Sequence, residues 1–237
     1  MFLSIIIPVF NEENTILDVI DLLEKTNFPP IINNWEVVVV DDCSTDKTYE
    51  KVKNYIQGNP NYSLFRNEKN TGKGASVKYG ILHSKGDTIL IQDADLELIP
   101  SDIPSLVNAM ITTKVQFING SRYLPGVSRP LFAYTRYLAN KLFTFFTSLV
   151  INVKLTDMAC AYKLFTRELY SQLNLNEKGF GFEAELIIKA MRIRKNNIAE
   201  VPVHYFPRNK GEGKKLKWLD GIVILWVIVK YGLLRIK

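Results

Sequence analysis

The segment from Gly86 to Glu97 reads GDTILIQDADLE. Residues 88–91 are apolar or β-branched and follow a Gly-Asp turn signal, which predicts a buried strand. Asp93 and Asp95 come at its exit, so extended backbone would point both carboxylates the same way, with Glu97 next in phase. Such a cluster needs a cation, and its oxygen-only ligands favour Mg²⁺ or Mn²⁺. Alone, an Asp-x-Asp pair also fits a solvated acidic loop, so its surroundings must discriminate.

The same pattern, a strand that ends in polar residues, recurs earlier in the chain. Four consecutive valines, residues 37–40, predict a strand buried on both faces, as in parallel sheets. Strands are also predicted over 3–9 and 62–66, and strands alternating with helices favour a parallel, doubly wound α/β sheet. Ligands bind such sheets at the carboxyl ends of the strands. The polar groups predicted there are Asn11 and Glu12, Asp41 and Asp42, residues 70–74 and residues 93–97.

This arrangement predicts a nucleotide and metal site. The Gly72-Lys73-Gly74 motif lacks the spacing of a phosphate-binding loop and of a dinucleotide fingerprint. A phosphate-loop ATPase or a dinucleotide dehydrogenase is therefore poorly supported.

Composition and charge limit the class of protein. The chain has 237 residues, 47% of them hydrophobic and 23% charged, which suits one large α/β domain and excludes a disordered chain. Cys43 and Cys160 lack metal-ligand spacing and are expected to be free thiols. No secretory signal is predicted at the start, so we expect the cytoplasmic side. The net charge of +6 gathers over residues 207–217 and at the end, which suits phosphate groups, an anionic membrane or a solvated basic face.

The remaining elements are predicted from periodicity and capping residues. Ser44 or Thr45 is expected to cap a helix over 46–56, and Ser101 a helix over 101–112. Further helices are predicted over 75–84, 131–153, about 182–194 and 218–234, with strands over 115–119 and 198–205. The aromatic helix over 131–153 fits core packing, a membrane surface or a second subunit. The last helix is too short to span a bilayer and is expected to be buried or interfacial.

Seven motifs together resemble the family 2 glycosyltransferases of GT-A fold, and among them the polyprenyl-phosphate (dolichyl-phosphate) hexosyltransferases. The motifs are IPVFNEE (6–12), VDDCSTD (40–46), NTGKG (70–74), DADLE (93–97), GSRY (120–123), LTDM (155–158) and EVPV (200–203) with the Pro-Arg pair at 207–208. The resemblance implies a nucleotide-sugar-binding domain over 1–207, Rossmann-like and with a mostly parallel sheet. A basic segment and amphipathic helix over 208–237 would belong to the same unit.

The resemblance also implies roles for individual residues. The base and ribose would be held by Pro8, Phe10, Glu12, Val40 and Asp42. The diphosphate and metal would be held by Asp93, Ala94 and Asp95, with Glu97 as a further metal ligand and Lys73 among the substrate-binding residues. Phosphates of donor or acceptor would meet Arg122, Arg208 and Lys214, because guanidinium groups bind phosphate oxygens bidentately.

Two positions depart from the family pattern. Phe10 replaces the usual tyrosine and removes one hydroxyl. Glu97 stands where dolichyl-phosphate mannose synthases commonly have Gln, which adds charge near the metal and weakens an inference to GDP-mannose.

The expected chemistry is attack of an acceptor oxygen on the anomeric carbon, with inversion, while the metal neutralises the departing nucleoside diphosphate. A lipid phosphate is already ionised and needs no strong base. A hydroxyl acceptor needs a carboxylate to take its proton, and Asp157 or Glu185 would be the candidate. The predicted catalytic set is therefore Asp95, Arg122, Asp157 and Glu185.

The sequence thus predicts a metal-dependent inverting transferase that moves a hexose from a UDP-glucose or GDP-mannose type donor to a polyprenyl phosphate. We expect it to lie peripherally on the cytoplasmic face of a membrane, without a nucleic-acid partner, and a homo-oligomer stays open. One alternative is a transferase that acts on a sugar hydroxyl of a glycolipid or polysaccharide. Another is a non-catalytic membrane or protein-interaction module that retains the fold.

Overall fold

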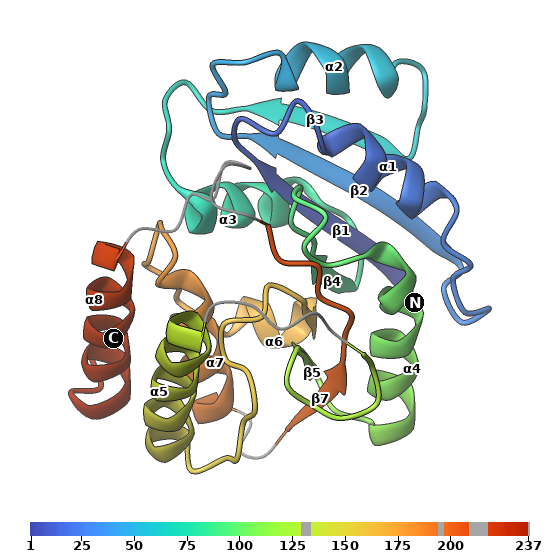
Figure 1. The fold of residues 1–237 in the computed structure, drawn as a ribbon. Coiled ribbons are helices and arrows are strands. Elements are labelled where there is room, and N and C mark those ends of the chain that lie inside the picture. The colour runs from blue at the N-terminus through green and yellow to red at the C-terminus, as the bar shows by residue number, and fades with distance from the viewer. Residues whose placement is uncertain (129–133, 194–196, 209–217, 237) are drawn as a thin grey trace.

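The computed structural model describes residues 1–128, 134–193, 197–208 and 218–236. Within these residues a seven-stranded sheet has the order β3-β2-β1-β4-β6-β5-β7 (Figure 1). The strands are β1 (Phe2–Val9), β2 (Asn34–Asp41), β3 (Tyr62–Arg66), β4 (Thr88–Ile91), β5 (Phe117–Ser121), β6 (Lys163–Thr166) and β7 (Ile198–Pro202). The helices are α1 (Ile16–Glu24), α2 (Thr48–Tyr55), α3 (Lys73–His83), α4 (Ile103–Thr113), α5 (Tyr134–Ile151), α6 (Arg167–Ser171), α7 (Phe182–Ile193) and α8 (Trp218–Val227). A 3₁₀ turn, Pro100–Asp102, precedes α4, and a π-helical turn, Ile228–Leu233, follows α8.

The N-terminal half is the predicted parallel sheet. β1 pairs in parallel with both β2 and β4, and β2 pairs in parallel with β3. The valines at 37–40 are fully buried, as expected of a strand covered on both faces. Val9 is in register with Asp41, and Ile6 with Ile91, so the loops that follow β1, β2 and β4 leave the sheet at the same edge.

The C-terminal half differs from the prediction, because β6 runs antiparallel to both of its neighbours, β4 and β5. The sheet is therefore mixed, with the parallel arrangement in the majority. The sequence predicts no strand here because the segment has four residues and begins with Lys163, which breaks the apolar pattern of a buried strand although it is fully buried.

Both predicted helix caps are wrong. α2 begins at Thr48 without a side-chain cap, because the Ser44 hydroxyl instead accepts a hydrogen bond from Asn11 N at 2.9 Å. Ser101 lies inside the 3₁₀ turn, and α4 begins two residues later. In each case a loop contact or a tighter turn replaces the predicted cap.

Three helices, α5, α7 and α8, pack together beside the C-terminal half of the sheet (Figure 1). α7 is buried along most of its length. The buried residues of α5 are polar, Asn140, Thr144 and Thr147. Of its apolar residues, Phe143, Val150 and Ile151 pack against the core, whereas six others are exposed and are not explained by core packing. In the described part of the chain, no helix combines the length and the apolar character needed to cross a membrane.

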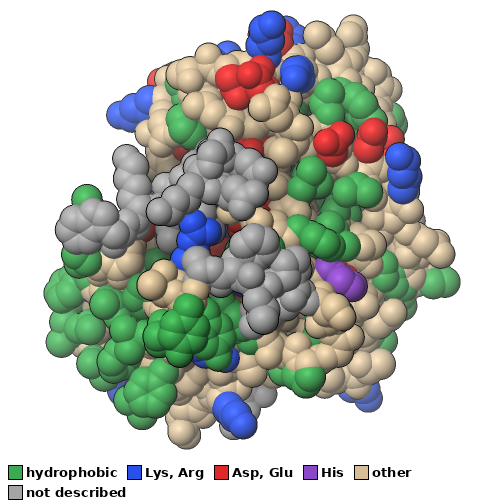
Figure 2. Space-filling model, viewed as in Figure 1, with side chains coloured by type: hydrophobic (Ala, Val, Ile, Leu, Met, Phe, Trp, Pro, Cys, Tyr) green, Lys and Arg blue, Asp and Glu red, His purple; other side chains and the backbone are tan. Residues whose placement is uncertain are grey.

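An exposed surface of apolar side chains covers α5 and α8, and we call it the apolar face. Figure 2 shows these side chains gathered at the lower left of the molecule. Phe145 of α5 is 62% exposed and Trp226 of α8 is 55% exposed. The apolar face comprises Tyr134, Leu138, Leu142, Phe145, Phe146 and Leu149 of α5, with Leu219, Ile222, Val223 and Trp226 of α8.

Candidate functional site

The loops after β1, β2 and β4 are joined directly at the edge of the sheet. Glu12 N donates to Thr48 Oγ1 at 2.8 Å, which joins the first loop to the start of α2. Thr15 Oγ1 donates to the carbonyl of Ala94 at 2.8 Å, which joins the same loop to the acidic segment. The predicted meeting of these polar groups is therefore present in the fold.

Asp42 organises the loop that precedes α3. Its carboxylate accepts hydrogen bonds from Asn67 Nδ2 at 2.7 Å, from the amide and hydroxyl of Thr71 at 2.9 Å, and from Gly72 N at 2.8 Å. Burial would raise the pKa of Asp42, but these hydrogen bonds outweigh it and hold the pKa below its usual value. Most of its acceptor capacity is therefore used within the protein before any nucleotide binds.

The other residues expected to hold the nucleotide fall into two groups. Pro8 and Phe10 are partly exposed at the strand exit, where a ligand can reach them. Val40 is fully buried and packs in the core beneath α3, so its side chain cannot contact a nucleotide. Ala94 is also buried, and its carbonyl is bound by Thr15. At Val40 the predicted contact can come only from the backbone.

The acidic segment does not continue in the extended geometry that the sequence predicts. Leu96 has φ of 58°, and the amide of Glu97 turns back to donate to Asp95 Oδ1 at 3.1 Å. Glu97 Oε1 accepts from Arg208 N at 3.1 Å, and its Oε2 accepts from the Tyr205 hydroxyl at 3.4 Å. Among the described residues no group of three or more His, Cys, Asp or Glu side chains is arranged to hold a metal ion. The extended backbone that would have aligned Glu97 with the two aspartates is thus absent.

Asp95 nevertheless lies in a strongly negative environment. Burial, together with the charges of Asp93 and Glu97, raises its pKa to about 7, and Arg208 offsets this only in part. Two neighbouring aspartates that offer only oxygen donors match the preferences of a hard divalent cation, although each also lies beside a cation of the protein, Lys73 or Arg208. The residues present therefore fit such an ion at Asp93 and Asp95.

Lys73 bridges the acidic segment and α7. Its ammonium lies 2.7 Å from Asp93 Oδ1 and 2.8 Å from Glu183 Oε1. Burial would lower the pKa of Lys73, but the two carboxylates raise it above its usual value, so the side chain stays charged. The sequence indicates Glu183 only as a carboxylate at a helix N-terminus, and its contact with Lys73 was missed because the two are far apart in the chain.

The glycines around Lys73 have a packing role. Gly72 has φ of 94°, and a Cβ at this position would lie 2.7 Å from the carbonyl oxygen of Lys178. A Cβ at Gly74 would lie 2.6 Å from the Cβ of Phe182. The two glycines let α3 approach the start of α7 closely enough for Lys73 to reach both carboxylates.

Residues 203–208 cross the carboxyl edge of the sheet and bring Arg208 to the acidic segment. His204 is anchored by Asp102, which accepts from both its amide and its imidazole at 2.7 Å. Arg208 Nε donates to the carbonyl of Asp95 at 2.9 Å, and Nη2 lies 2.7 Å from Glu12 Oε2. Arg208 therefore joins the loop after β1 to the loop after β4, where the sequence predicts a phosphate-binding residue.

Arg122, at the end of β5, is held by a fully buried carboxylate. Asp157 Oδ2 accepts from Arg122 N at 3.0 Å and from Nε at 2.7 Å, and Oδ1 accepts from Nη2 at 2.9 Å. Burial would raise the pKa of Asp157, but Arg122 and Asn140 hold it below its usual value. The guanidinium also lies 5.0 Å from the ring centre of Tyr205, which places it beside residues 203–208.

A buried polar network, which sequence reasoning missed, supports the Arg122–Asp157 pair. Asn119 Nδ2 donates to the carbonyl of Asp157 at 2.7 Å and to Glu200 Oε1 at 2.9 Å. Lys163 Nζ donates to Asn119 Oδ1 at 3.1 Å, and burial lowers the pKa of this lysine. Two of the sequence motifs contribute to this network: EVPV at 200–203 includes Glu200, and LTDM at 155–158 includes Asp157, whose carbonyl Asn119 binds.

Neither predicted base is placed for proton abstraction. Asp157 is committed to Arg122, and its lowered pKa makes it a weak base. Glu185 is fully buried, accepts from the amides of Asn176 and Glu177, and pairs with Lys189 at 2.7 Å. The structure does not support the catalytic role that the sequence predicts for Glu185. Lys214, the remaining predicted phosphate contact, lies outside the described residues.

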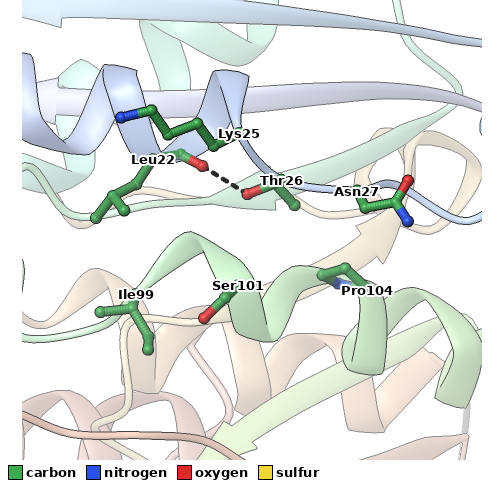
Figure 3. Close-up of a pocket in the computed structure, with 7 residues that line it drawn as sticks. All are labelled: Leu22, Lys25, Thr26, Asn27, Ile99, Ser101 and Pro104. Carbon is green, nitrogen blue, oxygen red and sulfur yellow. Dashed lines mark hydrogen bonds between the residues drawn. The ribbon is translucent and has the colours of Figure 1, made fainter.

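A hollow of about 350 Å³ lies elsewhere on the surface, between α1 and the start of α4 (Figure 3). Leu22 of α1 and Lys25, which follows this helix, line it on one side, and Ile99 and Pro104 line it from the facing side. It contains no carboxylate and none of the predicted site residues, so it is separate from the acidic edge.

A mixed α/β sheet whose carboxyl edge carries paired aspartates and flanking cations is the arrangement that the sequence predicts for a glycosyltransferase of GT-A fold. The family model described as glycosyl transferase family 2 matches residues 4–173, so the chain belongs to this family. The predicted fold class and the predicted glycosyltransferase class are confirmed.

Curated relatives and solved structures extend the comparison. The chain is 31% identical to "Dolichyl-phosphate beta-glucosyltransferase ALG5A" of Trichomonas vaginalis, over 94% of this chain and 70% of that protein. It is 30% identical to a dolichyl-phosphate beta-glucosyltransferase of Dictyostelium discoideum, over 86% and 66%.

Among solved structures, glucosyl-3-phosphoglycerate synthase from Mycobacterium tuberculosis, in complex with Mn²⁺, UDP and glucosyl-3-phosphoglycerate, superposes with a TM-score of 0.71 at 20% identity. The match covers 97% of this chain and 79% of that one. S. aureus TarS in complex with UDP-GlcNAc gives a TM-score of 0.63 at 19% identity, over 97% and 66%. These likenesses establish the shared fold.

Proposed function

We propose that the protein transfers glucose from UDP-glucose to a polyprenyl phosphate such as dolichyl phosphate, with inversion at the anomeric carbon. The observation that carries the proposal is the similarity, across 94% of the chain, to relatives named dolichyl-phosphate beta-glucosyltransferases. The UDP complexes of the solved neighbours support the choice of nucleotide over GDP.

The donor binds at the acidic edge. Asp93 and Asp95 would hold a divalent cation, Mg²⁺ or Mn²⁺, which would supply positive charge to the departing diphosphate. Lys73 and Arg208 add two further cations beside the same carboxylates. Glu12, which is held by Arg208, and the partly exposed Phe10 lie where the nucleoside would bind.

The acceptor phosphate binds at Arg122. A guanidinium held by a buried carboxylate has a fixed direction and presents its remaining donors to an anion. The phosphate oxygen is ionised near neutral pH and attacks without a strong base. The commitment of Asp157 and Glu185 to internal contacts therefore favours a phosphate acceptor over a sugar hydroxyl.

The apolar face brings the enzyme to a membrane, where a polyprenyl phosphate resides. α5 exposes Phe145 and Phe146 on this face, and exposed aromatic side chains suit the boundary between headgroups and acyl chains. Lys141 lies 4.7 Å from the ring centre of Tyr123 beside this face and suits anionic headgroups. We place the protein peripherally on the cytoplasmic surface.

An acceptor-partition assay tests the transfer. Purified protein is incubated with Mn²⁺ or Mg²⁺, labelled UDP-glucose or GDP-mannose, and a polyprenyl phosphate, and label in the organic phase is counted. We expect label from UDP-glucose, lost in an Asp95→Asn variant. Label that stays in the aqueous phase with every donor would overturn the lipid acceptor. Release of UDP with added oligosaccharide would then indicate a hydroxyl acceptor, and bound nucleotide without turnover would indicate a non-catalytic module.

A flotation experiment tests the membrane surface. Vesicles that contain anionic lipid should carry the protein upward at low salt. Protein that stays at the bottom and sediments as a dimer would instead assign the apolar face to a second copy of the chain.

A further inference from the structure

One buried residue connects the apolar face to the acceptor arginine. Asn140 lies on the inward side of α5 and is 7% exposed. Its amide nitrogen donates to Asp157 Oδ1 at 2.8 Å. The same oxygen accepts from Arg122 Nη2 at 2.9 Å, so the amide and the guanidinium share one carboxylate oxygen.

This contact fixes the orientation of the carboxylate. The other oxygen of Asp157 is bound by the amide and Nε of Arg122, and these donors belong to the residue that is being positioned. Among the described residues, Asn140 is the side chain other than Arg122 that donates to this carboxylate, and it belongs to a separate element, α5. A carboxylate held from two directions has one orientation, and the guanidinium that it binds then has one direction as well.

The Asn140 side chain has one satisfied and one unsatisfied polar group, which argues against a role in stability alone. Its side-chain oxygen is buried and has no hydrogen-bond partner in the part of the chain that the structure describes. A buried acceptor without a partner lowers stability, and this cost offsets part of the stabilisation that the hydrogen bond to Asp157 supplies. Residues that break a folding preference in this way are expected where function requires them.

We infer that Asn140 is a positioning residue for the transfer, which through Asp157 directs Arg122 toward the acceptor phosphate and links that arginine to the membrane-facing helix α5. The inference rests on the proposed function. Because the opposite side of α5 is the apolar face, the depth at which this helix docks sets the height of Arg122 relative to the lipid phosphate. The phosphate of a membrane-embedded polyprenyl lipid then meets the Arg122 guanidinium at a fixed height above the membrane.

The test compares Asn140→Leu with Thr144→Val. Thr144 lies one turn further along the same buried side of α5, and its hydroxyl accepts from Met158 N at 3.1 Å, so it contacts the same loop without touching Asp157. For both variants the KM for polyprenyl phosphate, the KM for UDP-glucose and kcat are measured. Thermal unfolding and equilibrium binding of UDP in the presence of Mn²⁺ are measured in parallel.

We expect Asn140→Leu to raise the KM for the acceptor about tenfold, as for loss of a hydrogen bond to a charged group. The KM for UDP-glucose and the dissociation constant of UDP should stay within about twofold of the wild type, since Asn140 does not contact the donor edge. Thr144→Val should leave both KM values unchanged. If leucine is not tolerated, Asn140→Ser removes the amide with less demand on packing and is expected to give the same separation of the two KM values.

An unchanged acceptor KM, or equal changes in both KM values and in UDP binding, would overturn the inference and leave Asn140 as a structural residue. Failure of the proposed function has a different signature. The wild type itself would then move no glucose into any lipid phosphate, and both proposals would fall together.

Discussion

The proposed donor edge and the proposed acceptor side of the site hold their charges in different ways. At the donor edge, which comprises Glu12, Lys73, Asp93, Asp95 and Arg208, the carboxylates and cations are partly exposed and pair with one another. On the acceptor side, Arg122 is bound by Asp157, which is fully buried and supported by Asn119 and Asn140. The donor edge can exchange its internal partners for a ligand, whereas the acceptor side is fixed by the fold.

The largest expected effect tests the donor edge. Asp95→Asn should reduce transfer about 10³-fold, because it removes a ligand of the proposed cation where charge develops on the leaving group. The variant should also be more stable than the wild type above pH 7, by on the order of 1 kcal/mol.

The sign of this stability change follows from the pKa. The carboxyl of Asp95 titrates near 7 in the fold and near 4 when unfolded, so its ionised form destabilises the folded state as the pH rises through this range. Activity assays and thermal unfolding without metal, at pH 5 and pH 8, check both parts. A variant that is active, or that is destabilised at pH 8, would contradict the description of this edge.

The next effect tests the acceptor side. Asp157→Asn leaves Arg122 without a charged partner in a buried position and should lower the free energy of unfolding by about 3 to 5 kcal/mol. The double variant Arg122→Met/Asp157→Leu removes both charges and should lose less. Denaturant unfolding at pH 7 gives both values. Equal losses for the single and double variants would show that the pair contributes through packing instead.

Lys73→Met tests how much the cation at this position contributes to binding of the donor. The ammonium that bridges Asp93 and Glu183 is lost, and we expect the KM for UDP-glucose to rise about tenfold while the KM for the lipid phosphate stays unchanged. Lys78→Met is a matched control, since that lysine lies on the same helix and donates to the carbonyl of Leu175. Steady-state kinetics with each substrate varied in turn decide the outcome.

A smaller effect is expected at the apolar face. Phe145→Ser and Trp226→Ser should each weaken binding to anionic vesicles about tenfold, since each removes a large apolar side chain from the proposed docking surface. Leu82→Ser is the control, because Leu82 is 77% exposed but lies on α3, outside the apolar face. Flotation with increasing lipid measures the three variants. If Leu82→Ser weakens vesicle binding equally, the apolar face is not the docking surface.

The smallest expected effect concerns the backbone of the loop between β2 and α2. Cys43 has φ of 63°, a conformation that favours glycine. Cys43→Gly should raise the free energy of unfolding by up to about 1 kcal/mol and leave the kinetics unchanged. A loss of stability would show that the contact of its thiol with the carbonyl of Glu68 outweighs the backbone strain.

Prediction from the sequence succeeded where the pattern is local. The strand over 62–66 has the predicted bounds, and the four valines form the predicted buried strand. It failed where contacts are remote in sequence. β6 is a strand because it fits between β4 and β5, although it is short and begins with a lysine. Glu97 departs from the expected phase because Leu96 adopts a positive φ.

The sequence by itself determined the family, the parallel half of the sheet and the polar residues at its carboxyl edge, because strand periodicity and residue type are local properties. Only the tertiary structure decided which of these residues are committed to one another. Asp157 is bound to Arg122, Glu185 to the loop before α7, and Asn140 to Asp157, and each pairing joins segments from different parts of the fold. Burial and hydrogen bonding depend on all the elements that surround a side chain, so such commitments appear only when the chain is folded.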